Sequence, residues 1–96
     1  MEGNNKIEQK LTDAWENRKN DLRASFNTAI HLFQETKEVN YQKGIADSSK
    51  ILGYCYWRFS DYSKSLNYSL SARGIYKSLN DKKGEADTLN SLGAVY

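Results

Sequence analysis

The chain of 96 residues contains no proline, and it has a single cysteine and a single histidine. Because proline interrupts helices more strongly than any other residue, its absence permits long continuous helices. Cys55 alone cannot form an intramolecular disulfide or a cysteine-based zinc cluster. The start of the chain lacks the apolar segment of a secretory signal, and no stretch approaches the roughly 18 apolar residues of a membrane span. We therefore expect a cytoplasmic protein that does not associate with membranes.

The charge of the chain is moderate and evenly mixed. Fourteen basic and twelve acidic residues give a net charge of +2 at pH 7, and the two signs are interleaved along the sequence. A nucleic-acid-binding protein usually carries a concentrated basic patch, so we do not expect nucleic acid as a partner. The hydrophobic fraction of 39% and the charged fraction of 27% are typical of a globular helical domain.

One stretch of the sequence recurs 40 positions later. Residues 44–56 read GIADSSKILGYCY and residues 84–96 read GEADTLNSLGAVY. The identical pairs are Gly44/Gly84, Ala46/Ala86, Asp47/Asp87, Leu52/Leu92, Gly53/Gly93 and Tyr56/Tyr96. The same spacing relates residues 21–44 to residues 61–84, where Asp21/Asp61, Ser25/Ser65 and Asn40/Asn80 are identical. A fixed period of this length indicates stacked structural repeats.

Apolar residues at spacings of three and four predict that each repeat is a pair of helices. The first pair is expected at residues 6–19 and 21–39, the second at about 45–59 and 61–79, and an unpaired fifth helix at 84–96, with polar loops at 40–43 and 80–83. In the second helix of each pair we expect the inward residues to be Leu22, Phe26, Ala29, Ile30, Phe33 and Val39, then Tyr62, Leu66, Leu70, Tyr76 and Leu79. Gly53 lies inside a helix, which suggests a close approach by a neighbouring helix.

The second repeat resembles the tetratricopeptide repeat (TPR) family in its 40-residue form. The matching residues are Leu52-Gly53, Tyr56, the turn Asp61-Tyr62, Ser65, Tyr68, and Ala72 before Ile75-Tyr76. Two residues depart from the family pattern, namely Ser69, where an aromatic is common, and Gly74 within the helix. The resemblance implies an all-α, right-handed superhelix of stacked hairpins, whose first helices line a concave groove that binds peptides or proteins.

The expected organisation is one domain over residues 1–96. It comprises repeat one at about 6–43, repeat two at about 44–83 and a partial repeat three at 84–96. Because the sequence stops in mid-pattern, we expect it to be the N-terminal part of a longer protein.

The groove residues are expected to lie on the first helix of each repeat, on the side that avoids the packing face. They are Lys10, Ala14, Asn17 and Arg18 in repeat one; Asp47, Lys50, Tyr54, Trp57 and Arg58 in repeat two; and Asp87 and Asn90 in repeat three. Lys10 and Lys50 are 40 residues apart, as are Arg18 and Arg58, so paired cations could hold a carboxylate. The alternative interpretation is that these are solvated charges on a helix surface.

No catalytic, cofactor or metal site is predicted. His31 has no acid–base partner at a motif spacing, and it is interpreted as a helix-surface residue. Cys55 shares its repeat position with Val95, which favours an apolar packing residue over a reactive thiol. The sequence contains no phosphate loop and no nucleophile elbow, so we do not expect an enzyme.

Two functions are predicted from the resemblance. The first is a protein- or peptide-binding scaffold. The alternative is a regulatory or dimerising input domain, because arrays of this kind are similar to the input regions of bacterial histidine kinases, nucleotide cyclases and peptide-sensing regulators. That likeness concerns the fold alone, and no functional site is compared.

A third interpretation is self-association through the unpaired last helix, with Leu89 and Leu92 on the exposed face. On this interpretation the mass measured by light scattering rises with concentration, and Leu92→Lys abolishes the rise because it places a charge in the apolar contact. A monomeric mass at every concentration would contradict it.

Overall fold

The computed structural model describes the backbone of residues 2–95 and the side chains of residues 4–90. Over this range the chain forms helices and no strand, which confirms the expected all-α class. The helices are α1 (Glu2–Glu16), α2 (Leu22–Glu38), α3 (Gln42–Arg58), α4 (Tyr62–Ser78) and α5 (Lys82–Val95). None of them combines the length and the apolar character that crossing a membrane would require.

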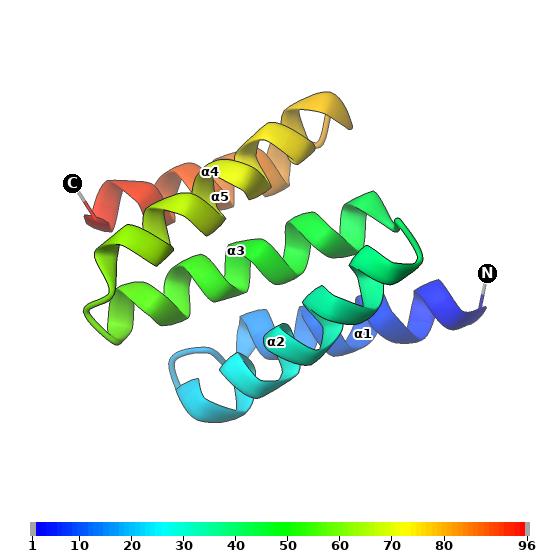
Figure 1. The fold of residues 1–96 in the computed structure, drawn as a ribbon, viewed down its shortest axis with the longest axis horizontal. Coiled ribbons are helices and arrows are strands. Elements are labelled where there is room, and N and C mark those ends of the chain that lie inside the picture. The colour runs from blue at the N-terminus through cyan, green and yellow to red at the C-terminus, as the bar shows by residue number, and fades with distance from the viewer. Residues whose placement is uncertain (1, 96) are drawn as a thin grey trace.

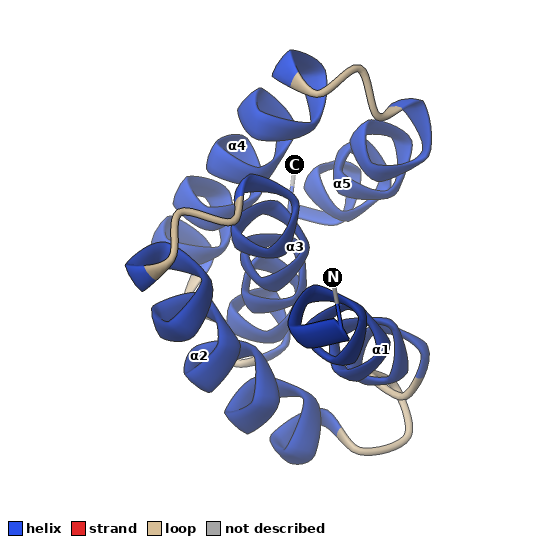
Figure 2. Cartoon of the chain, turned by 90° about the vertical axis from the view of Figure 1, so that its right-hand side faces the viewer, coloured by secondary structure: helices blue, strands red, loops and turns tan. Residues whose placement is uncertain are grey.

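Helix α3 packs against each of the other four helices (Figure 1). Consecutive helices run in opposite directions, so α1–α2 and α3–α4 are antiparallel hairpins. Figure 2 shows α2 and α4 on one side of α3, and α1 and α5 on the other. Within the described residues the backbone of α2 stays apart from that of α4, although the Phe33 and Tyr68 rings meet edge to face, and the backbone of α1 stays apart from that of α5. Helix α3 therefore lies between two layers, one formed by α2 and α4 and the other by α1 and α5, and the backbones of the two helices in each layer stay apart.

Three of the helices end in the same way. Asn40, Ser60 and Asn80 adopt positive φ angles of 55°, 67° and 57°, in the left-handed region. The next residue then donates its N–H to a carbonyl five residues back, as in the Tyr41 N–H bond of 2.9 Å to the Thr36 carbonyl. This is the Schellman arrangement, which satisfies the last carbonyls of a helix and turns the chain sharply. The turn is short enough to return the next helix against the one before.

The expected helix boundaries were wrong in α1, α3 and α5. Helix α1 ends at Glu16 and not at residue 19, because the Asn17 side chain donates to the Asp13 carbonyl and the Arg18 side chain donates to the Trp15 carbonyl. Helices α3 and α5 begin inside the stretches expected to be loops, at Gln42 and Lys82. The left-handed residues Asn40 and Asn80, two positions before these starts, complete the turn, so the polar residues that follow are already helical.

The two hairpins share a contact that reveals a shift in register. The Ser25 hydroxyl donates to the Ala14 carbonyl at 2.7 Å, and the Ser65 hydroxyl donates to the Gly53 carbonyl at 2.6 Å. The two serines are 40 residues apart, whereas Ala14 and Gly53 are 39 residues apart. Within α1, the structural counterpart of a residue in α3 is therefore one position later than the sequence period predicts.

The inward face of α4 consists mainly of small residues. Its buried side chains are Ser65, Ser69, Ala72 and Tyr76, and those of α2 are Ser25, Ala29, Leu32 and Thr36. The expected inward positions of Tyr62, Leu70, Leu79, Ile30 and Val39 were wrong, because these side chains are exposed, Tyr62 by 53% and Val39 by 64%. Small residues at spacings of three and four let α3 approach closely, so the large apolar side chains face outward.

Two glycines make this close approach possible. A Cβ atom at Gly53 would overlap the Ser69 hydroxyl of α4, which confirms the expected close approach of a neighbouring helix. A Cβ atom at Gly84 in α5 would overlap the ring of Tyr76, which is fully buried. Gly74, in contrast, has no atom within 4 Å of the position of its missing Cβ.

Gly84→Ala is expected to lower the free energy of unfolding by about 1–3 kcal/mol, because the buried Tyr76 ring has no room to move. The matched control Gly74→Ala is expected to raise it by about 0.5–1 kcal/mol, since alanine favours the helix and meets nothing. Urea unfolding of both variants tests the pair. Equal effects of the two substitutions would show that α5 does not pack closely on Tyr76.

Candidate partner-binding face

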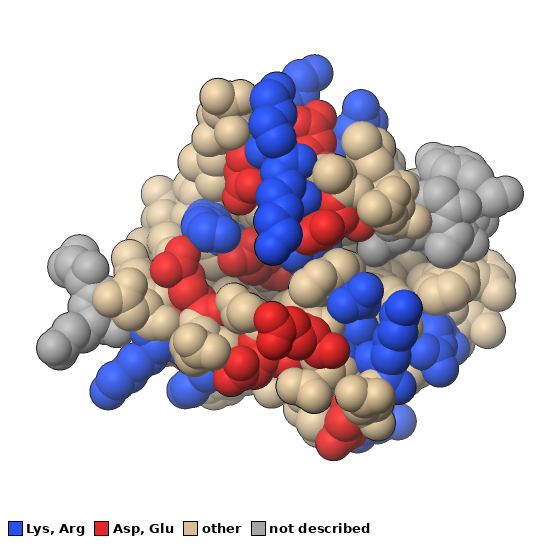
Figure 3. Space-filling view, turned by 180° about the vertical axis from the view of Figure 1, so that it is seen from behind, with Lys and Arg blue, Asp and Glu red and all other residues tan. Residues whose placement is uncertain are grey.

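Helices α1, α3 and α5 share one side of the molecule, and two cavities open on it. We call the larger the basic–aromatic cavity. It has a volume of about 450 Å³ and is lined by Arg18, Lys19, Tyr54, Trp57, Arg58, Asp87 and Asn90. The smaller, mixed-charge cavity has a volume of about 220 Å³, and Asp87 lines both. Figure 3 shows this side of the molecule, with acidic and basic side chains interleaved across it.

Lys50 in the mixed-charge cavity is a structural cation. Its residue is only 8% exposed, its Nζ lies 3.4 Å from Oδ2 of Asp87, and it stands 4.2 Å from the ring centre of Trp15. Burial lowers the pKa of Lys50, and the nearby carboxylates of Asp47 and Asp87 only partly oppose this effect. The sequence places Lys50 in the groove, and it does line a cavity there, but its charge already joins α1, α3 and α5.

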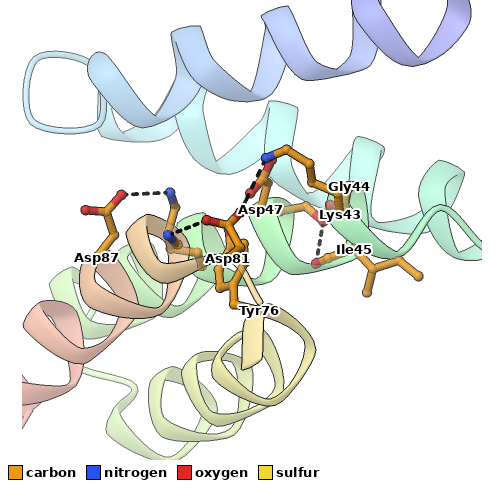
Figure 4. Close-up of polar contacts among 10 residues, drawn as sticks. Lys43, Gly44, Ile45, Asp47, Tyr76, Asp81 and Asp87 are labelled. Carbon is orange, nitrogen blue, oxygen red and sulfur yellow. Dashed lines mark hydrogen bonds and ion pairs between the residues drawn. The ribbon is translucent and has the colours of Figure 1, made fainter. Parts of the chain in front are cut away.

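A second polar cluster closes the mixed-charge cavity. The Tyr76 hydroxyl donates to Oδ1 of Asp47, and Lys43 Nζ lies 3.3 Å from Asp47 and 3.8 Å from Asp81 (Figure 4). Burial and the Asp47 carboxylate raise the pKa of Tyr76. Burial alone would lower the pKa of Lys43, but Asp47 and Asp81 outweigh it and raise that pKa.

Sequence reasoning missed this cluster, which joins α3 to both α4 and α5. The only feature of the sequence that drew attention to Asp47 was its recurrence as Asp87 in the next repeat. It pointed to the groove and gave no indication that Tyr76 of the neighbouring helix was the partner.

The basic–aromatic cavity is built around Tyr54, which is buried between two tryptophans. Its ring centre lies 6.2 Å from that of Trp15 and 5.8 Å from that of Trp57. Arg58 Nη1 donates to the Tyr54 hydroxyl at 2.9 Å. The Arg18 guanidinium lies 3.7 Å from the ring centre of Trp15 and 5.2 Å from that of Tyr54. Aromatic faces thus position both arginines.

The cations of this cavity are free of carboxylate partners. Among the described residues Arg18, Lys19 and Arg58 form no ion pair, and the Nε atom of Arg18 is buried without a hydrogen-bond partner. The carboxylate that lines the cavity, Asp87, is engaged by Lys50. The cavity therefore presents an excess of positive charge.

Lys10 and Asn17 do not belong to this face. They line a separate cavity of about 730 Å³ between α1 and α2, together with His31. The register shift explains the difference, because it makes the buried Leu11, and not Lys10, the counterpart of Lys50. The predicted pairing of Lys10 with Lys50 is wrong.

The remaining predicted residues have ordinary surroundings. His31 is exposed, with Nε2 3.7 Å from Glu35. Cys55 is buried, and burial raises the pKa of its thiol to about 12. Leu89 is exposed, whereas the side chain of Leu92 lies outside the described residues. Within the part of the chain that the structure describes, no three His, Cys, Asp or Glu side chains gather as metal ligands would.

Comparison of the chain with protein-family models, with curated proteins and with solved structures gives no match.

The shifted pKa of Cys55 predicts how stability depends on alkaline pH. The fold favours the protonated thiol, so its contribution is fully present below the ordinary pKa of 9.0 and is lost as pH rises toward about 12. Tyr41, whose pKa burial and Glu8 raise from 10.0 to about 12, adds a second loss that begins near pH 10.

Cys55→Ala is therefore expected to remove the part of the pH dependence that begins near pH 9, so the free energies of unfolding of the two proteins should change differently with pH from about pH 9 upward. Each group contributes at most about 1.4 kcal/mol per pH unit. Urea unfolding under reducing conditions between pH 8 and 11 measures the decline. The same pH dependence in both proteins would contradict the burial of the thiol.

Proposed function

We propose that this chain is a non-enzymatic, TPR-like binding module. In this proposal the hairpins stack as a right-handed superhelix, and the face formed by α1, α3 and α5 binds an acidic peptide segment of a partner protein. The positive excess in the basic–aromatic cavity is the observation that carries the proposal.

The repeat arrangement is supported by contacts that recur along the chain. The Schellman ends at Asn40, Ser60 and Asn80 give successive helices the same turn. The serine-to-carbonyl bonds from Ser25 and Ser65 fix both hairpins in the same way. Identical local contacts in successive units are what a stacked array requires.

The chemistry of the cavity favours an acidic peptide. Arginine holds carboxylates through two parallel hydrogen bonds, and both Arg18 and Arg58 are positioned by aromatic rings beside the cavity. Trp57 offers an apolar surface that can cover a neighbouring side chain of the peptide. The Asn90 side chain, at the far wall, can bond the peptide backbone.

The adjoining mixed-charge cavity favours a particular polarity along the peptide. Its carboxylates are Glu16, Asp47, Asp81 and Asp87, against the lysines Lys43, Lys50 and Lys83. A peptide that lies across both cavities would place its acidic residues at Arg18 and Arg58 and a basic or polar residue beside Glu16. This order of charges would determine the orientation in which the peptide lies across the two cavities, and it would contribute less to the affinity.

The proposal predicts that a displayed library of twelve-residue peptides, selected on this chain, yields acidic sequences. The best of these peptides should bind more weakly as salt rises, because exposed charge pairs are screened. Arg18→Gln, Arg58→Gln and Trp57→Ala should each lower its affinity about tenfold. Fluorescence anisotropy with the labelled peptide measures the change.

Arg73→Gln is the matched control, since Arg73 is exposed on α4 and does not line the cavity. Circular dichroism of every variant confirms that the helices remain. Selection of neutral or basic peptides, or an equal loss of affinity in the Arg73 variant, would overturn the proposal.

A further inference from the structure

The opposite side of the molecule carries a groove that the peptide-binding face does not include. The backbones of α2 and α4 stay apart, with α3 between them as a floor (Figures 1 and 2), and the two helices meet through the rings of Phe33 and Tyr68. The resulting α2–α4 groove encloses about 410 Å³, and Phe33, Ile45, Tyr68 and Ile75 supply its apolar lining. This volume falls in the range of sites that hold small organic molecules.

Ser49, on the floor of the α2–α4 groove, has an unused hydroxyl. The residue is fully buried, and its Oγ has no hydrogen-bond partner. Its neighbour Ser48 behaves differently, because that hydroxyl donates to the Gly44 carbonyl at 2.7 Å. A buried hydroxyl without a partner is costly, so a ligand atom that bonds it would gain more than at an exposed site.

Lys37 gives the α2–α4 groove its charge. Its ammonium lies 5.0 Å from the ring centre of Phe33, and within the described residues it forms no ion pair. Among the described residues, no Asp or Glu lines the groove. The groove thus combines an apolar body, one unused hydroxyl and one unpaired cation.

We propose that the α2–α4 groove binds a small amphipathic aromatic carboxylate. The aromatic body packs against the joined rings of Phe33 and Tyr68, the carboxylate pairs with Lys37, and a polar atom on the ring system bonds the Ser49 hydroxyl. The edge-to-face contact of Phe33 with Tyr68, at 5.4 Å between ring centres, leaves aromatic edges to pack against the ligand. This site is independent of the peptide-binding face.

Three related compounds test the site. A hydroxynaphthoate, with its hydroxyl and its carboxylate on opposite rings, offers both polar groups, while naphthoate lacks the hydroxyl and naphthol lacks the carboxylate. Titration of the full chain, followed by ligand fluorescence, should show the hydroxynaphthoate binding about fivefold more tightly than either of the others. Equal affinity for all three, or no binding, would overturn the proposal.

Two substitutions should remove one preference each. Ser49→Ala should abolish the advantage of hydroxynaphthoate over naphthoate, and Lys37→Gln should abolish its advantage over naphthol. The control for the first is Ser69→Ala, because the Ser69 hydroxyl is also buried without a partner among the described residues but does not line the groove. The control for the second is Lys77→Gln, the position 40 residues along on α4. Loss of either preference in a control variant would contradict the assignment.

Backbone amide shifts locate the compound independently of its affinity. On addition of hydroxynaphthoate, the largest changes are expected at Ile45, Ser49 and Ile75. Changes centred on Tyr54 and Trp57 would place the compound on the peptide-binding face instead and would overturn the proposal.

Discussion

Helix α3 is surrounded by the other four helices, and the rest of the fold depends on that contact. Ten of its residues are buried, and they include Gly44, Ala46, Ser48 and Gly53 as well as large apolar side chains. A helix can be approached from several sides only where its side chains are short, so small residues determine where α4 and α5 come closest. The outer helices then diverge because each follows a different side of α3, which leaves the α2–α4 groove on one side and the two cavities on the other.

Burying α3 on all sides also brings polar groups into the interior, and their partners come from several helices. Lys50 pairs with Asp87 of α5 and lies over Trp15 of α1, while Asp47 accepts a bond from Tyr76 of α4. A buried charge that loses its partner is strongly destabilising, so these contacts specify how α5 and α1 sit on α3. They also engage Lys50, Asp47 and Asp87 at the mixed-charge cavity, whereas the cations of the basic–aromatic cavity form no ion pair among the described residues.

The sequence predicted the helices and the hairpins, because a 40-residue period and helical spacing survive any change in packing detail. It did not predict which face of α4 is buried. The prediction placed the large apolar side chains of this helix inward, whereas its contact with α3 depends on the small residues Ser65, Ser69 and Ala72. The register of α1 was missed because the chain between the bonded positions is 11 residues from Ala14 to Ser25 and 12 from Gly53 to Ser65, a difference that a comparison of identical positions does not reveal. Lys10 was therefore paired with Lys50. Tyr54, Trp57 and Arg58 line one cavity, because residues three and four apart share a face of α3.

Hydrogen exchange of the backbone amides tests the central role of α3 most directly. The contacts described above predict that amides between residues 46 and 55 exchange only when the whole chain unfolds, whereas those of α1 and α5 exchange by smaller local openings. As urea is added, the exchange of the α3 amides should follow the urea dependence of global unfolding from the start, whereas the amides of α1 and α5 should merge with it only at higher urea. The account would be contradicted if the α3 amides exchanged as fast as those of α1 or α5 while the amides of the α1–α2 hairpin remained protected.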